Sequence, residues 1–269
     1  MNETTNGSNS ALPPMIDTHC HLDDHQFADD LDNVLRNSRE AGVTRWILIG
    51  YDPDRWDDAT ELKNQHEGMF HTVGVHPSCA DQWSDEVATR LIDVATKSGA
   101  VGIGEAGLDF YRDNAPFEIQ AAAFSAQLEI AADLNLPIVI HMRNAESEML
   151  ELLRCRDRLP TLIFHSFDGT DRLMDYAIES GSYVGVGGLA TRQKSDMLRE
   201  QLKRVPVERI LLETDAPYLV PARQKDRRNQ PAHIATIATM IAAHLETTPE
   251  LLAERTTANA ERVFGLRHD

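Results

Sequence analysis

Eight short apolar stretches recur along this chain, and they restrict its possible folds more than any other feature. Longer segments separate most of them, and in these segments the apolar residues recur at helical spacing. We predict that the apolar stretches are strands, at residues 15–18, 46–49, 70–75, 100–103, 137–140, 161–164, 183–186 and 210–212. The predicted helices are residues 31–41, 85–97, 118–134, 145–154, 170–179 and 194–203.

Strands that alternate with helices favour a parallel sheet, because a right-handed crossover through a helix brings the next strand alongside the last. Eight such units in 269 residues fit a closed (β/α)8 barrel, the TIM barrel, better than two open sheets. No linker-like stretch divides residues 15–269, which we predict to form one domain, and residues 1–14 are predicted to be a disordered tail. Gly102 and Gly104 do not match a dinucleotide-binding fingerprint, so we expect them to allow close packing.

Composition excludes several classes of protein. An apolar share of 42% with only 15 glycines is unlike collagen or a disordered chain. No run approaches the roughly 18 apolar residues of a membrane helix, and the first ten residues do not resemble a secretion signal. The 3 cysteines are an odd number at unrelated spacings, which argues against a disulfide framework. We therefore predict a cytoplasmic protein with no membrane partner.

The net charge of −17 bears on the kind of substrate. Negative charge opposes general adhesion to polyanions such as nucleic acids. A substrate that carries phosphate would therefore need metal ions or a local basic patch on this protein.

Side chains of the kinds that bind metal ions follow five of the predicted strands. In a TIM barrel the carboxyl ends of the strands form one rim, where the active site lies. Burying many ionisable groups without a partner costs several kcal/mol each, and a metal ion removes that cost. We therefore predict a metal centre made by His19, His21, Glu105, His141, His165 and Asp215.

His19 and His21 are two residues apart at the end of the first strand. On an extended strand both imidazoles point to the same side and can hold one ion together, whereas Cys20 points to the other side.

Six ligands are more than one four-coordinate ion with an open position requires. Two divalent ions a few ångströms apart would use all of them, provided that Glu105 bridges the ions. Mixed imidazole and carboxylate ligands suit Zn, Mn, Co or Fe, and Mg less comfortably, so the identity of the metal stays open. The remaining ligands would divide into His19, His21 and Asp215 at one position and His141 and His165 at the other.

Seven short motifs carry a resemblance to a known family. They are IDTHCHLDD at 16–24, GVHP at 74–77, GEAGLDFYRD at 104–113, IHMRNA at 140–145, FHSFDG at 164–169, LLETDAPYL at 211–219 and RNQP at 228–231. From residue 15 to about residue 265 the chain resembles the TatD family of metal-dependent deoxyribonucleases, within the amidohydrolase-like barrels. The resemblance implies a TIM barrel, two divalent ions (Zn, Mn, Mg or Co) on the six ligands, and exonucleolytic hydrolysis of DNA at single strands or free ends.

Three positions depart from the usual family pattern, and none of them removes a ligand. Ala106 replaces an isoleucine, Met142 replaces a serine, and Gln230 replaces a glutamate in RNEP. Any role that depends on the charge of that glutamate is therefore in question. Glu105, at the point where related barrels often carry a modified lysine, favours this branch over dihydroorotase-like enzymes.

The expected mechanism follows from the two ions. They would lower the pKa of a water molecule that attacks phosphorus, and they would neutralise charge on the phosphoryl oxygens. Asp215 is our candidate for the group that accepts the proton of this water, and Glu105 is the bridging carboxylate. Glu213, two residues before Asp215, either orients a metal ligand or is a packed acid at the end of its strand.

Basic side chains near the predicted rim are candidates for binding phosphate. Arg227 and Arg228 lie in a basic loop after the Asp215 strand, for which the alternative is an exposed, solvated segment. Arg112, Arg143 and His76 follow other strands. His76 could donate to phosphate, donate a proton, or be an ordinary loop histidine.

We predict a two-metal hydrolase that acts on the phosphodiester bonds of DNA. A first alternative is an ester or amide hydrolase of related architecture, such as a D-aminoacyl-tRNA deacylase, because the same activated water attacks a carbonyl carbon. A second alternative is a non-catalytic binding protein, against which the complete ligand set argues. The sequence leaves the end preference and the oligomeric state open.

Overall fold

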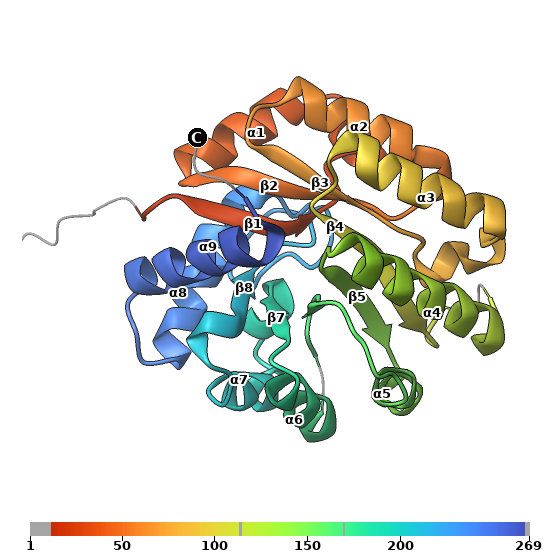
Figure 1. Cartoon of the computed structure of the whole chain (residues 1–269). Coiled ribbons are helices and arrows are strands. Elements are labelled where there is room, and N and C mark those ends of the chain that lie inside the picture. The colour runs from red at the N-terminus through yellow and green to blue at the C-terminus, as the bar shows by residue number, and fades with distance from the viewer. Residues whose placement is uncertain (1–11, 113–114, 169, 267–269) are drawn as a thin grey trace, which may run out of the picture.

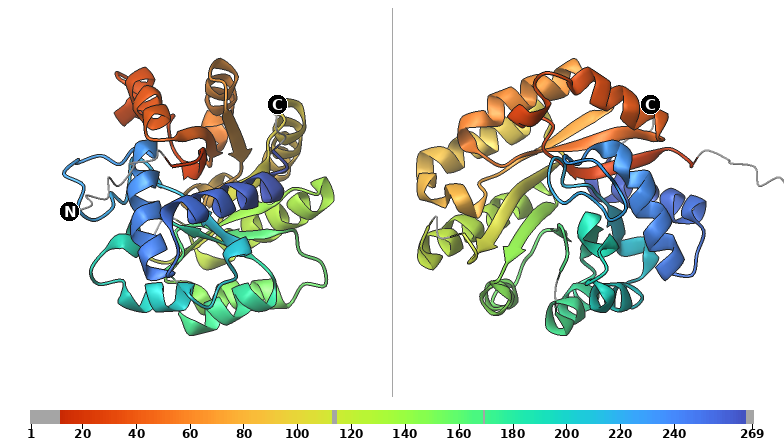
Figure 2. Two further views of the ribbon diagram at one scale, coloured as in Figure 1. Left: turned by 90° about the vertical axis from the view of Figure 1, so that its left-hand side faces the viewer. Right: turned by 180° about the vertical axis from the view of Figure 1, so that it is seen from behind.

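The computed structural model describes residues 12–112, 115–168 and 170–266. Within these residues eight parallel strands lie side by side in chain order, with helices around the outside (Figures 1 and 2). This arrangement confirms the predicted (β/α)8 barrel. The strands are β1 Met15–Cys20, β2 Val43–Gly50, β3 Met69–Val73, β4 Gly102–Asp109, β5 Ile138–Arg143, β6 Leu162–Phe164, β7 Tyr183–Val186 and β8 Ile210–Leu212.

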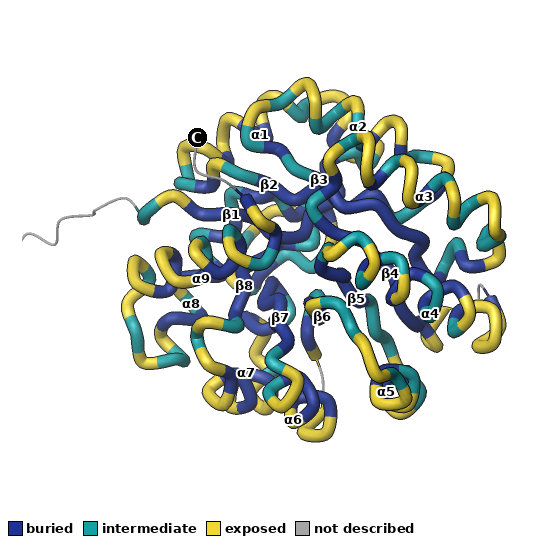
Figure 3. The backbone as a smooth tube through the Cα atoms, in the orientation of Figure 1, coloured by how far each residue is buried: buried dark blue, intermediate teal, exposed yellow. Residues whose placement is uncertain are grey.

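The helices cover the outer face of the sheet, with their inner sides buried and their outer sides exposed (Figure 3). None of the helices in the described part of the chain is long and apolar enough to cross a membrane. The helices are α1 Leu31–Glu40, α2 Trp56–Gln65, α3 Asp85–Ser98, α4 Phe117–Leu134, α5 Glu146–Arg154, α6 Asp171–Glu179, α7 Asp196–Leu202, α8 Ile234–His244 and α9 Pro249–Phe264.

Helices α2, α8 and α9 lie outside the six predicted helical ranges. Helix α2 is mostly polar and buries only Trp56 and Ala59, so its apolar pattern is weak. Helix α8 has the opposite composition, because its sequence IATIATMIAAH is apolar on nearly every side. A helix without a polar face shows little helical periodicity.

The first and last strands meet at their carboxyl ends and bring the barrel close to closure. The backbone N–H of Asp215 donates to the carbonyl of His19 over 2.9 Å. The N–H of His21 donates to the carbonyl of Ala216 over 2.7 Å. These bonds place two segments almost 200 residues apart in the sequence next to each other.

Inside the barrel, an apolar layer supports the polar groups. Val139, Ile163 and Leu211 belong to one buried apolar cluster. Because strand side chains alternate with a period of two, the residue two positions further along each strand faces the same side. Those residues are His141, His165 and Glu213, so the strand pattern itself places polar groups above an apolar floor.

Strand β4 differs from its prediction, which was residues 100–103. The strand begins at Gly102 and continues to Asp109, so Glu105 lies within it. The two glycines in the run GEAGLD obscured this continuation, because glycine is uncommon inside strands. In the structure Gly104 and Gly107 have φ values of +123° and +150°. A Cβ atom on Gly107 would lie 1.9 Å from the carbonyl oxygen of His141, which only glycine avoids.

Two further expectations concern the N-terminal tail and the cysteines. The predicted tail lies outside the described residues up to residue 11, and Leu12 packs in part against the core. All three cysteines are free, in agreement with the prediction that no disulfide framework is present.

Candidate metal centre and active site

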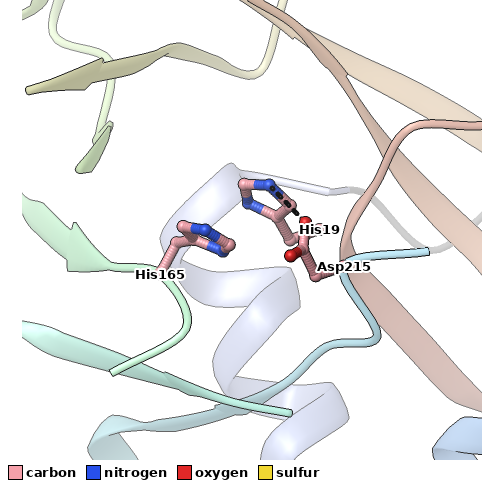
Figure 4. Close-up of side chains that lie close together, drawn as sticks. All are labelled: His19, His165 and Asp215. Carbon is pink, nitrogen blue, oxygen red and sulfur yellow. Dashed lines mark ion pairs between the residues drawn. The ribbon is translucent and has the colours of Figure 1, made fainter. Parts of the chain in front are cut away.

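The end of β1 and the segment after β8 bring together three of the predicted ligands. The Nε2 atoms of His19 and His21 lie 3.3 Å apart. Asp215 Oδ1 lies 3.7 Å from Nε2 of His19 and 3.3 Å from Nε2 of His21. Figure 4 shows Asp215 beside His19, with the imidazole of His165 next to them. The thiol of Cys20 points to the other side, toward the carbonyl of Ile47 at 3.5 Å.

The Glu105 carboxylate lies at the centre of the cluster. Its Oε1 atom is 2.7 Å from Nδ1 of His141, 3.4 Å from Nε2 of His165 and 3.8 Å from Nε2 of His76. Its Oε2 atom is 3.5 Å from Nε2 of His19. The two oxygens therefore face imidazoles that we assigned to both metal positions, as a bridging carboxylate requires.

The structure groups the ligands in a way that the sequence did not indicate. The imidazole of His165 stacks on that of His19, with 3.7 Å between the ring centroids. His76, which we predicted as a substrate-binding residue, forms a compact group with Glu105 and His141.

Glu213 lies where it can orient His165. Its Oε1 atom is 3.2 Å from Nδ1 of His165 and also accepts a hydrogen bond from the N–H of Ser166. Gly185 on β7 makes room for it, because a Cβ atom there would lie 2.1 Å from Oε2 of Glu213. The other ring nitrogen of His165 is then turned toward Glu105.

Burial and the neighbouring charges oppose each other at this cluster. Burial disfavours the charged form of Glu105, yet His165, His141 and His19 hold the pKa of its carboxyl well below the ordinary value. Burial likewise opposes a charged His165, yet Glu105 and Glu213 raise its pKa to about 10. The cluster therefore favours positive charge between its carboxylates.

The donor atoms fit divalent metal ions. Among the residues that the structure describes, three groups of three have ligand atoms within 4.8 Å of one another. The Nδ1 atoms of His19 and His21 are buried without hydrogen-bond partners, while their Nε2 atoms face each other and Asp215. The two facing Nε2 atoms and the Asp215 oxygen can each donate an electron pair, so a cation could bind all three. Mixed nitrogen and oxygen donors of this kind suit transition metals.

A cavity of about 480 Å³ opens onto the cluster. Three arginines line it, namely Arg112, Arg143 and Arg192, and among the described residues none of their guanidinium groups has a carboxylate partner. The guanidinium of Arg143 lies 3.6 Å from the ring centroid of Tyr111. Free cations are thus concentrated at the mouth of the site in a chain whose net charge is −17.

Comparison with known proteins identifies the family. Residues 16–265 match the family described as TatD related DNase. The proteins named 3′-5′ ssDNA/RNA exonuclease TatD from Citrobacter koseri and Escherichia coli are each 37% identical to this chain over 258 residues, which are 94% of this chain and 99% of each relative. The chain belongs to the TatD family. It is therefore an enzyme of a family of metal-dependent nucleases.

A solved structure supports the same assignment. The YjjV protein of Escherichia coli, described as a TatD homologue, superposes with a TM-score of 0.86. It is 26% identical, and the match covers 94% of this chain and 98% of that one. The two proteins therefore share one fold over nearly the whole matched length.

The predicted phosphate-binding residues of this TatD-family enzyme lie in two different places. His76, Arg112 and Arg143 line the cavity. Arg227 is exposed and outside the lining. Arg228 is also outside it, because both its terminal nitrogens pair with the carboxylate of Asp30, at 2.9 and 2.7 Å.

The TatD motif RNQP has a structural role next to the site. The buried amide of Asn229 donates to the carbonyls of Thr214 and Tyr218, at 2.8 and 2.7 Å. Its oxygen lies 2.8 Å from Nδ1 of His233. These bonds tie the backbone on both sides of Asp215 to the segment that leads into α8.

Sequence reasoning missed Arg192 and Asp109. Arg192 follows β7 and was not considered because no motif marks it. Asp109 Oδ2 lies 3.1 Å from Nε2 of His141, and Asp109 was missed because β4 was predicted to end at residue 103. The alternation of β4 could have indicated it, since Asp109 follows Glu105 by four residues.

Proposed function

We propose that this TatD-family enzyme hydrolyses phosphodiester bonds of single-stranded DNA from a free end, with two divalent ions held by the six predicted ligands. The observation that carries the proposal is the position of Glu105, whose oxygens face imidazoles from both metal positions beside a cavity lined by unpaired arginines. The metals that we consider are Zn, Mn, Mg and Co.

When bound, the two ions would lower the pKa of an attacking water and offset charge on the phosphoryl oxygens. Asp215 can accept the proton of this water only if its carboxyl is ionised. Burial disfavours the charged form, but His21, His165 and His19 lower the pKa of this carboxyl. It is therefore an unprotonated carboxylate near neutral pH. Glu213 would hold the imidazole of His165 in its ligating orientation.

His76 is suited to donate a hydrogen bond to the substrate. Burial lowers its pKa to about 3, so the imidazole is neutral at pH 7. Its Nδ1 atom accepts a hydrogen bond from the N–H of Ser78 over 3.0 Å. The proton of the neutral ring is then on Nε2, which lies 3.8 Å from Oε1 of Glu105 in a residue that lines the cavity, and which could donate to a phosphoryl or leaving-group oxygen.

Arg112, Arg143 and Arg192 would bind the phosphates on either side of the scissile bond. Guanidinium groups bind phosphate through two hydrogen bonds. Among the described residues no carboxylate forms an ion pair with these three, although Asp168 in the same cavity attracts Arg143. They supply the local positive charge that the acidic chain needs. Because relatives are named 3′-5′ ssDNA/RNA exonucleases, we extend the proposal to single-stranded RNA and to attack from the 3′ end.

We also propose that residues 15–269 act as one domain in the cytoplasm. The family match over 16–265 supports the first statement, and the three free cysteines are consistent with a reducing compartment.

The test uses metal-free protein and single-stranded DNA labelled at one end or the other. Addition of Mn, Mg, Co or Zn in turn should restore release of mononucleotides, first from the 3′ end. Glu105→Ala should fold normally and release none. If no metal restores release while a carboxyl ester is cleaved, the enzyme is the alternative ester hydrolase. Binding of DNA without cleavage under every metal would instead favour the non-catalytic alternative.

A further inference from the structure

The carboxylate of Asp109 makes two sets of contacts, one with each of its oxygens. Oδ2 lies 3.1 Å from Nε2 of the proposed ligand His141. Oδ1 accepts hydrogen bonds from the backbone N–H groups of Tyr111 and Arg112, at 2.8 and 2.9 Å. One buried carboxylate thus contacts both a metal ligand and the loop that carries a cavity arginine.

The position of Asp109 is itself fixed by the next helix. The buried side chain of Gln120 on α4 accepts from the N–H of Asp109 at 2.8 Å and donates to the carbonyls of Asp109 and Ala115, at 3.2 and 2.7 Å. The side chain of Asp109 therefore lies on a segment that is held from behind. This rigid support is what a residue needs if it is to orient another group.

We propose that Asp109 is a positioning residue that fixes the tautomer of His141 and, through the same carboxylate, the loop that presents Arg112 to phosphate. The proposal rests on the proposed function, in which His141 is a metal ligand. Both oxygens of Asp109 meet nitrogen donors, Oδ1 the two backbone N–H groups and Oδ2 the imidazole of His141, so the carboxylate acts as an acceptor at each contact.

The geometry at His141 decides which ring nitrogen meets the ion. A carboxylate acceptor beside Nε2 requires that Nε2 carry the hydrogen, which leaves a lone pair on Nδ1. Nδ1 lies 2.7 Å from Oε1 of Glu105, a hydrogen bond in the metal-free enzyme, so this lone pair would become available when an ion takes the place of the shared proton. Carboxylates that accept from a metal-ligating histidine in this way increase the affinity for the ion.

The decisive variant is Asp109→Asn. The amide oxygen can still accept from the two backbone N–H groups, so the loop should stay in place. The amide nitrogen would donate to Nε2 of His141, and the hydrogen of the imidazole would move to Nδ1, where the ion should bind. We expect the affinity for Mn²⁺, measured by calorimetry on the folded metal-free protein, to fall roughly 10- to 100-fold at one of the two positions.

Steady-state kinetics at saturating Mn²⁺ separate the two roles. Asp109→Asn should keep the KM for single-stranded DNA within about twofold of the wild type, because the loop hydrogen bonds remain, whereas Asp109→Ala should raise KM as well as lose metal affinity. A purely structural role would move both quantities together in both variants. Asp157→Asn is the matched control, since it removes the same charge from an exposed position on the segment before β6, outside the cavity lining, and its Mn²⁺ affinity should stay near that of the wild type.

Failure of this inference is distinct from failure of the proposed function. If the wild type binds no Mn²⁺ at all, the proposed metal centre is wrong. If the wild type binds Mn²⁺ and Asp109→Asn binds it equally tightly, Asp109 does not position His141. A crystal structure of the wild-type enzyme with Mn²⁺ gives an answer that does not depend on any variant, because an ion bound to Nε2 of His141 would overturn the proposal and an ion bound to Nδ1 would support it.

Discussion

Replacing Glu105 with glutamine tests the centre of the proposed site through protein stability. Glutamine keeps the volume of the side chain, so it creates no cavity, but it removes the negative charge that both metal positions share. In the wild type the Glu105 oxygens lie 2.7 to 3.5 Å from ligand nitrogens of His141, His165 and His19. We therefore expect Glu105→Gln to weaken binding at both positions.

The size of the effect follows from mass action. An ion that binds only the folded protein stabilises it by about 2.7 kcal/mol when its free concentration is 100 times the dissociation constant. In a protein of this length, 1 kcal/mol changes the melting temperature by roughly 2–4 °C. Each Mn²⁺ ion should therefore raise the melting temperature of the wild type by about 5–10 °C, and Glu105→Gln should lose nearly all of this increase.

The assay is thermal unfolding, followed by circular dichroism with and without Mn²⁺ at matched ionic strength. Glu118→Gln, at an exposed position of α4, removes the same charge outside the cavity lining and should keep the wild-type increase. A Glu105→Gln variant whose melting temperature rises as much as that of the wild type would refute the bridging role, because it would show that the ions bind without this carboxylate.

Three further changes test other parts of the site and the core. Arg192→Ala should raise the KM for single-stranded DNA about 10- to 100-fold with little change in kcat, because it removes a charged hydrogen bond to phosphate worth about 1.5–3 kcal/mol. Steady-state kinetics would measure both quantities. Gly185→Ala should force the Glu213 carboxylate away from His165, because the new Cβ atom would lie 2.1 Å from Oε2 of Glu213. Calorimetry should then show weaker Mn²⁺ binding, and an unchanged affinity would mean that Glu213 only packs there. Burial lowers the pKa of His71 from 6.5 to about 4, so the unfolded chain takes up a proton first as the pH falls, and stability is lost below about pH 6.5. Urea unfolding of metal-free protein should show that His71→Gln loses about 2 kcal/mol less than the wild type between pH 7 and pH 5, and equal losses would contradict this explanation.

Much of the site could be predicted because the barrel translates a local pattern into a position. Side chains alternate along each strand, and parallel strands end at one rim, so a histidine that follows an apolar strand has few places to go. His141 and His165 lie two residues beyond Val139 and Ile163 for this reason. The same logic gave the eight strands, although it failed for α8, whose apolar residues surround the helix.

The tertiary structure alone decided the partners of each polar side chain. Arg228 looked like a phosphate-binding residue in the sequence, but the Asp30 carboxylate at the start of α1 binds its guanidinium. Arg192 looked like any arginine, yet no carboxylate of the described residues reaches it, so its charge stays free for a substrate. Asp109 contacts His141 only because β4 and β5 are neighbours in register.

The amino-acid sequence by itself determined the barrel and the kinds of side chain at its rim, since both depend on spacing along a single strand or helix. Which imidazole stacks on which, which oxygen meets which nitrogen, and which arginine remains unpaired depend on distances across the barrel. Those distances arise only when strands far apart in the chain are brought side by side, and no local pattern encodes the competition between carboxylates for the same cation.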